Sequence, residues 1–287
     1  MGLFLTFQGQ KEPYRKIYTL AGAKRHYIPG QVWHITHRCH KQEFLLKFVK
    51  DRKRWIQWLF EAKRRYGLTI LNYVVTSNHI HLLVVDDKDR MTIPRAIQLT
   101  AGRHAQEFNQ RKKRKGAYWE DRYHATAIET GKHLLRCITY IDLNMVRAGV
   151  VSHPSEWACG GYHEIQSPRR KCILIDYEKL FGLSGCDSYA TFQSLHRNLV
   201  NNAIENDKNK REARWSQSIA VGEKQFVTEI KKRLASKALG RKAQPLDDGF
   251  QLREDIMLYN ADFDAENSKI VPKNTYKWEI FPEITKG

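Results

Sequence analysis

Two histidines at alternate positions open the segment whose residue types best suit chemistry. In NYVVTSNHIHLLVV, residues 72–85, His79 and His81 flank Ile80 at the start of an apolar run typical of a strand. Side chains at positions i and i+2 of a strand point to the same face, so both imidazoles project together. Two adjacent imidazoles suit a divalent cation. Two polar residues at the start of a strand give the same pattern, so H-x-H alone leaves both interpretations open.

A tyrosine and an asparagine four residues apart provide further groups for such a site. Residues 131–149 have helical periodicity, and Tyr140 and Asn144 lie one turn apart on a flank of the apolar stripe. Asparagine is unfavourable inside a helix, but its amide oxygen can bind a hard cation. We therefore expect His79, His81 and Asn144 to be three neutral ligands for Mg²⁺ or Mn²⁺, with Tyr140 nearby as a nucleophile. Core packing also suits an isolated tyrosine.

Taken together, these motifs resemble those of a known family. His79-Ile80-His81 and Tyr140-x-x-x-Asn144 are similar to the H-U-H and Y-x-x-x-N motifs of single-tyrosine HUH transposases, where U is apolar, and among these to REP-associated tyrosine transposases. YWEDRYHATAI resembles the family's W-x-x-R-F/Y segment. YIDLNMVRAGVV resembles Y-I-x-x-N-P-V-R-A-G-L-V, with Met145 in place of the usual proline. The resemblance covers residues 23–165, and WSQSIAVGEKQFV and NTYKW are similar to segments of long members of the group.

The resemblance implies a metal-dependent transposase that cleaves and rejoins single-stranded DNA at REP-type hairpins. Tyr140 would attack a phosphodiester, giving a 5′-phosphotyrosine and a free 3′-hydroxyl. His79, His81 and Asn144 would hold Mg²⁺ or Mn²⁺, which would orient and polarise the scissile phosphate. DNA transposition and recombination would be the biological outcome. The resemblance also implies a monomer rather than a dimer, with a C-terminal segment packed near the site.

A strong positive charge independently favours a polyanionic partner. The 287 residues include 49 Lys and Arg against 31 Asp and Glu, a net charge of +18. Residues 24–150 contain 25 Lys and Arg and 11 Asp and Glu, so 25 − 11 gives +14 for this part alone. Such a balance is typical of nucleic-acid-binding proteins.

The candidate DNA-binding residues are a basic run and four residues in or beside the matched segments. They are Arg111, Lys112, Lys113, Arg114, Lys115, Trp119, Arg122, Tyr123 and Arg147. The arginines and lysines would contact phosphate, and the two aromatic residues would stack on exposed bases. A solvated helix end also explains the basic run, and core packing also explains the aromatic residues.

Cysteine use and hydropathy bound the location of the protein. The five cysteines, at positions 39, 137, 159, 172 and 186, form no C-x-x-C pair. This argues against a disulfide framework or a zinc knuckle and favours a reducing cytoplasm, where a transposase would associate with the nucleoid. No stretch approaches the roughly 20 apolar residues that span a membrane. We interpret residues 1–22 as a flexible leader rather than a signal peptide.

The elements that must position these residues follow the order β-α-β-β-α-β-α. The expected strands are residues 30–38, 68–75, 79–85 and 123–129, and the expected helices are residues 44–67, 91–116 and 131–149. This order predicts an α+β fold, with a ferredoxin-like or RRM-like antiparallel sheet and helices. The transposase domain would cover residues 23–165. A mainly helical C-terminal region and an irregular tail from Gln244 would occupy residues 166–287.

Three other functions stay open. A 2H-type phosphoesterase would need two H-x-T/S motifs, and after residues 34–36 the second would have to be residues 79–81, which do not fit. A domesticated transposase would hold hairpins without cutting them. A hydrolytic HUH nuclease or relaxase-like initiator would share the chemistry, but its motifs normally come in another order and its chain is usually longer. Metal-dependent cleavage of single-stranded hairpins separates the first two from a transposase.

Overall fold

The computed structural model describes residues 28–87, 89–206 and 210–254. The expected leader and the part of the expected tail that contains Tyr276, Trp278 and Phe281 lie outside these residues. The strands are β1 Val32–Arg38, β2 Thr69–Val75, β3 His79–Val85, β4 His124–Ile128, β5 Ala220–Gly222, β6 Arg241–Leu246 and β7 Gly249–Glu254. The main helices are α1 Val49–Tyr66, α2 Thr92–Lys112, α3 Lys132–Asp142, α4 Asn144–Arg147, α5 Tyr162–Gln166, α6 Tyr177–Ser184, α7 Tyr189–Glu205, α8 Arg214–Gln217 and α9 Lys224–Leu234.

One sheet contains the seven described strands, in the order β2-β3-β1-β4-β5-β7-β6. The first four of these positions are antiparallel throughout, with α1 between β1 and β2 and α2 between β3 and β4. This is the ferredoxin-like arrangement that the order of elements predicts, so the expected α+β fold is confirmed.

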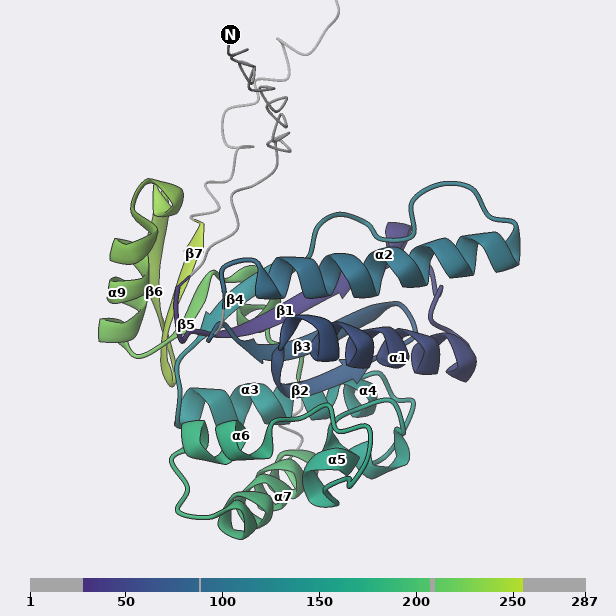
Figure 1. Cartoon of the computed structure of the whole chain (residues 1–287). Helices are drawn as coiled ribbons and strands as arrows, with labels where there is room; N and C mark the ends of the chain where they lie inside the picture. The colour runs from purple at the N-terminus through teal and green to yellow at the C-terminus, as the bar shows by residue number, and fades with distance from the viewer. Residues whose placement is uncertain (1–27, 88, 207–209, 255–287) are drawn as a thin grey trace, which may run out of the picture.

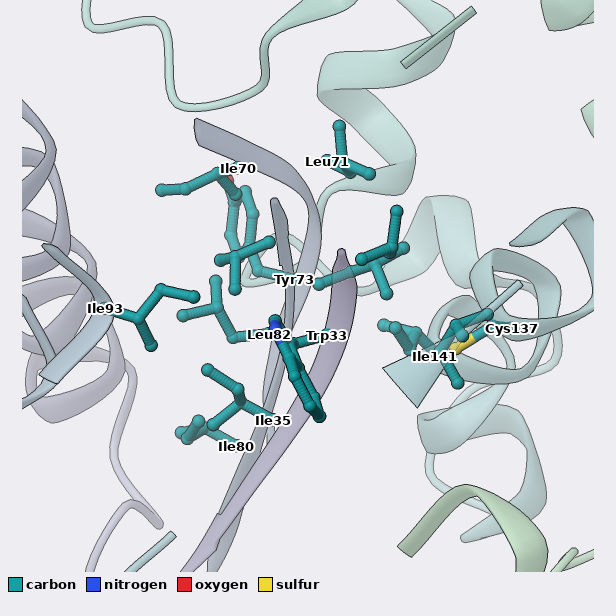
Figure 2. Close-up of a cluster of buried hydrophobic side chains, with 14 of the residues drawn as sticks. Trp33, Ile35, Ile70, Leu71, Tyr73, Ile80, Leu82, Ile93, Cys137 and Ile141 are labelled. Carbon is teal, nitrogen blue, oxygen red and sulfur yellow. The ribbon is translucent and has the colours of Figure 1, made fainter. Parts of the chain in front are cut away.

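Helices cover both faces of this sheet. Helices α1 and α2 pack side by side on one face, and α3 and α6 lie on the other (Figure 1). In the core, Ile93 of α2 lies on one side of the strands, and Cys137 and Ile141 of α3 lie on the other (Figure 2). Strand β1 alternates as expected, with buried Trp33 and Ile35 on the opposite face from His34 and Thr36.

The expected helix over residues 131–149 is wrong at one point, because it breaks at Leu143. Helix α3 ends at Asp142, Leu143 has a ψ of 4°, and α4 begins at Asn144. The path stays nearly helical, since the amide of Arg147 donates to the carbonyl of Leu143 at 2.9 Å. Asn144 therefore lies in the first turn of a short helix, where asparagine is less unfavourable than in a helix interior.

Two other helices are shorter than their patterns predict. Helix α1 begins at Val49 rather than residue 44, and the preceding residues form turns. Helix α2 ends at Lys112, because Lys113 takes a left-handed conformation with φ 51°. The basic run over residues 111–115 therefore spans the end of this helix and the turn after it.

The C-terminal part of the chain continues the sheet. Strand β5 pairs in parallel with β4, and β7 and β6 follow it at that edge (Figure 1). Helices α6, α7 and α9 agree with the expected helical region, whereas β5 is an addition to it. The expectation of irregular chain from Gln244 is wrong up to Glu254, since residues 241–246 and 249–254 form a hairpin. The division at residue 165 stays a prediction.

Across the described residues, each helix is too short or too polar to cross a lipid bilayer.

Candidate active site

The four predicted catalytic residues line one cavity on the α3 side of the sheet. It has a volume of about 710 Å³, and His79, His81, Tyr140 and Asn144 all contribute to its wall. They come from the start of β3, the last turn of α3 and the start of α4. Residues 60 or more positions apart in sequence therefore meet as the motifs predict.

His81 is fixed on both ring nitrogens. Its side chain is almost completely buried, with the residue 3% exposed. The Nε2 atom lies 2.8 Å from Nδ2 of Asn144, and the Nδ1 atom lies 2.8 Å from Nε2 of His34. The His34 and His81 rings stack with centroids 5.0 Å apart. The ring of His81 therefore has little freedom to rotate.

His79 is held by the turn that precedes β3. Its Nδ1 atom lies 2.7 Å from Oδ1 of Asn78 and 3.0 Å from Oγ1 of Thr76. An amide oxygen only accepts hydrogen bonds, so Nδ1 of His79 carries a proton and donates. The neutral ring then has its lone pair on Nε2.

Both imidazoles are neutral near pH 7. Burial lowers the pKa of His79 to about 4, and the charge of Arg38 adds to this effect. Burial also lowers the pKa of His81 well below 6.5, with smaller contributions from His79 and His34. A neutral imidazole is the form that binds a metal ion.

These residues suit a divalent cation. Two neutral imidazoles and one amide oxygen form a mixed N/O donor set, compatible with Mg²⁺ or Mn²⁺. Among the described residues, no group of three or more His, Cys, Asp or Glu could hold a metal ion. Asn144 would be the third protein ligand of an ion at His79 and His81, through its amide oxygen, although its nitrogen faces His81 here.

Tyr140 packs among aromatic rings and under a cation. Its ring centroid lies 6.0 Å from that of His81 and 5.9 Å from that of Trp215. The Cζ atom of Arg147 lies 4.0 Å from the Tyr140 ring centroid. Burial raises the pKa of the Tyr140 hydroxyl, and Arg147 acts in the opposite direction. The hydroxyl is therefore protonated at neutral pH.

The wall of the cavity is rich in arginine. Arg38, Arg122, Arg147 and Arg211 contribute to its wall, against two acidic residues, Glu120 and Asp121. A net positive wall favours a phosphate group. Two of these arginines, Arg122 and Arg147, are among the predicted DNA-binding residues.

The predicted basic run lies outside the cavity wall, and its members differ. Arg111 forms an ion pair with buried Asp51, and Arg114 donates to the carbonyl of Ala117 at 2.8 Å and lies 3.6 Å from Glu43. The three lysines are all exposed: Lys112, Lys113 and Lys115. Arg111 thus links the end of α2 to α1, Arg114 stabilises the turn after α2, and the three lysines face solvent.

The two predicted base-stacking residues are half-buried. Trp119 donates from Nε1 to the carbonyl of Ala101 at 3.1 Å, and its ring stacks on His37 with centroids 4.1 Å apart. This favours the packing alternative for Trp119. Tyr123 lies just before β4, and its role in DNA binding stays a prediction.

Several residues of the site carry no motif in the sequence. His37, Arg38, His124 and Arg211 line the cavity, and His34 supports His81 from behind. The alternation of β1 places His34 and Thr36 on one face, and Thr36 is the register partner of His81. This alternation was a usable signal for His34, but only once the pairing of β1 with β3 is known.

One family model and two solved structures are similar to parts of this chain. A model of the family described as IS200-like transposases matches residues 30–144. A REP-associated tyrosine transposase bound to a REP hairpin is 21% identical, with 52% of this chain and 87% of that chain covered and a TM-score of 0.41. A putative transposase from Deinococcus radiodurans is 17% identical, with 35% and 81% covered and a TM-score of 0.28. None of the curated proteins compared with the chain matches it.

The family match extends from the residues before β1 to the first residue of α4. It therefore includes both histidines, the tyrosine and the asparagine of the cavity. Residues 30–144 are therefore similar to IS200-like transposases, a likeness that the histidine and tyrosine motifs predict.

Proposed function

We propose that the protein is a single-tyrosine transposase of the REP-associated type, which cuts and rejoins single-stranded DNA at hairpins. The observation that carries this proposal is the shared cavity of Tyr140, His79, His81 and Asn144, inside the region that matches the transposase family. The motifs around Tyr140 and the positive charge of the chain support it.

The nucleophile in this proposal is the hydroxyl of Tyr140. Its oxygen forms a bond to phosphorus, the bond between phosphorus and the 3′ oxygen breaks, and the released 3′ oxygen ends with a proton. The product is a 5′-phosphotyrosine and a free 3′-hydroxyl. Because the covalent bond retains the energy of the phosphodiester, reversal of the same step joins the strand to another 3′-hydroxyl.

His79 and His81 would hold a Mg²⁺ or Mn²⁺ ion through Nε2, and Asn144 through its amide oxygen. When bound, such an ion polarises a phosphate oxygen and favours attack at phosphorus. Arg147 lies over the Tyr140 ring and would add positive charge where the phosphate enters. Arg122 and Arg38, at the wall of the same cavity, would hold the flanking phosphates.

The position of Tyr140 favours unpaired DNA as substrate. The residue is only 6% exposed, so a phosphate must enter the cavity to reach its hydroxyl. A single strand can bend one phosphate inward, whereas a duplex is stiff and carries a second strand that would meet the cavity wall. The hairpin and REP-palindrome preference comes from the family resemblance of the motifs, as does the expectation of a monomer.

A cleavage assay tests the proposal. Full-length protein is incubated with Mg²⁺ and single-stranded DNA that contains a hairpin and its flanks, taken from palindromes of the source genome. We expect one cut outside the stem and a protein–DNA adduct that survives denaturation. The fully paired duplex should bind but stay uncut, and Tyr140→Phe should bind the hairpin without forming the adduct.

The same assay separates the proposal from its alternatives. Binding without an adduct, in the wild type and with either metal, would indicate a domesticated hairpin-binding protein. Cleavage that yields no adduct at any time would indicate a hydrolytic nuclease. An adduct that persists in Tyr140→Phe would exclude Tyr140 as the nucleophile, and Tyr123 would be tested next.

A further inference from the structure

Four groups from distant parts of the chain form a continuous row of hydrogen bonds behind the cavity. The carbonyl of Trp215 lies 2.8 Å from Nδ1 of His34, and Nε2 of His34 lies 2.8 Å from Nδ1 of His81. The row ends where Nε2 of His81 lies 2.8 Å from Nδ2 of Asn144. His34 and Trp215 are completely buried.

The row has only one direction of donation that leaves His34 neutral. The Trp215 carbonyl can only accept, so Nδ1 of His34 carries the proton and donates to it. The Nε2 atom of a neutral His34 then has a lone pair, which must accept from Nδ1 of His81. His81 is thereby left with its own lone pair on Nε2, the atom that faces the cavity.

The opposite direction would require a buried cation. If Nε2 of His34 donated, both nitrogens of His34 would carry protons and the ring would be positive. An unpaired charge in a completely buried site costs far more than a change of tautomer. The geometry therefore selects neutral His34 as acceptor.

We propose that His34 is a positioning residue that fixes His81 in the tautomer whose Nε2 can bind a metal ion, an inference that rests on the proposed metal-dependent function. The Trp215 carbonyl sets this tautomer, although Trp215 lies 181 positions from His34 and beyond the family match. The C-terminal part of the chain thus sets the tautomer of His81 through one backbone oxygen.

The Trp215 carbonyl is well placed for this role because its segment is tied to β4. Oγ1 of Thr126 lies 2.7 Å from the carbonyl of Ser218 and 3.3 Å from that of Trp215. The Nε2 atom of His124 lies 2.9 Å from the same Ser218 carbonyl. The Trp215 ring also packs against Tyr140, so one segment positions the backs of both the nucleophile and a metal ligand.

Two variants of full-length protein separate positioning from packing. His34→Leu keeps the volume but offers no acceptor to His81. His34→Gln can donate from its amide nitrogen to the Trp215 carbonyl and accept at its amide oxygen from His81. His104→Gln is the matched control, since His104 is a buried histidine on α2 and lies outside the cavity wall.

The first readout is the tautomer of His81 in metal-free protein, measured by long-range ¹H–¹⁵N spectra of labelled histidine. The signals are assigned from their loss in His81→Asn. We expect the wild type and His34→Gln to carry the proton on Nδ1. In His34→Leu the Nε2–H form should become populated.

The second readout is Mn²⁺ affinity, measured by titration. This affinity should fall about 10- to 100-fold in His34→Leu, recover in His34→Gln and stay unchanged in the control.

The two readouts distinguish failure of this inference from failure of the proposed function. A His34→Leu variant with wild-type Mn²⁺ affinity and an unchanged His81 tautomer would overturn the inference. Wild-type protein that binds no Mn²⁺ would contradict the proposed metal dependence. In that case the spectra still decide whether His34 sets the tautomer of His81. Equal hairpin binding by all variants in chelator would show that the fold is intact.

Discussion

The guanidinium group of Arg147 both covers the ring of Tyr140 and binds its backbone. Its Cζ atom lies 4.0 Å from the ring centroid, and Nη2 donates to the Tyr140 carbonyl at 2.7 Å. This bond spans the break at Leu143 and so ties α4 to α3. Arg147 was predicted to bind DNA, and in the free protein it positions the candidate nucleophile.

The first prediction concerns this contact. Arg147→Gln should lower the single-turnover cleavage rate by about 100-fold, because it removes the cation nearest the attacking group. Hairpin affinity should fall less than tenfold, since one charge among many is lost. Arg147→Lys should recover only part of the rate, because lysine lacks the planar group that stacks on the ring. Equal losses of rate and affinity would place Arg147 in substrate binding alone.

A second prediction concerns the metal ligands. His79→Ala, His81→Ala and Asn144→Ala should each lose cleavage in Mg²⁺, and chelator should silence the wild type. Mn²⁺ should partly restore Asn144→Ala, because two imidazoles remain and Mn²⁺ binds nitrogen more strongly than Mg²⁺ does. The assay is adduct formation across a titration of each metal. Full wild-type activity in chelator would contradict the assignment of all three residues.

The sequence predicts those parts of the site that local periodicity encodes. Alternation in β3 places His79 and His81 on one face, and helical spacing places Tyr140 near Asn144, so these four residues meet as expected. The bond between His34 and the Trp215 carbonyl has no such local signal. It depends on tertiary packing between segments 181 positions apart, and its acceptor is a backbone atom that any residue would provide.

The helix break at Leu143 and the hairpin of β6 and β7 were missed for related reasons. Neither glycine nor proline occupies residues 142–144, so nothing local ends α3. The hairpin forms at a sheet edge built by β5, which is three residues long. Partners distant in sequence stabilise both features, and local propensity is too weak to predict them.

The third prediction separates the two roles of the basic run. Changing Lys112, Lys113 and Lys115 to Gln should weaken hairpin binding and reduce the slope of log K against log salt by about 2, since three phosphate contacts are lost. The free energy of unfolding should hardly change, and the cut site should not move. Salt titrations of binding and a mapped cleavage position check both points.

The matched control is Arg111→Gln, in the same run. Asp51 is 2% exposed and pairs with Arg111, so this change leaves a buried carboxylate without its cation. We expect a loss of about 2 kcal/mol in the free energy of unfolding, with a small effect on the salt slope. The assignment of roles is contradicted if the lysine variant is the less stable protein, or if its cut position shifts.

The last prediction concerns pH and His104. This side chain is 2% exposed on α2, and its Nε2 lies 3.0 Å from the Tyr118 hydroxyl. Burial lowers its pKa from 6.5 to about 4. Between these values the unfolded chain binds a proton that the folded protein does not bind. The contribution of neutral, buried His104 to the free energy of unfolding is therefore complete above pH 6.5. It is lost as the pH falls toward 4, because protonation then favours the unfolded chain.

The size of this effect follows from the two pKa values. At pH 5 the unfolded state gains about 2 kcal/mol from protonation of His104, and the folded state gains almost nothing. Other buried histidines add to the total loss in the wild type, so the variant His104→Gln isolates one residue. Urea unfolding in chelator at pH 7 and pH 5 should show a loss about 2 kcal/mol smaller for the variant. An equal loss in both proteins would mean that His104 accepts its proton as easily in the fold as in the unfolded chain, and that burial does not lower its pKa.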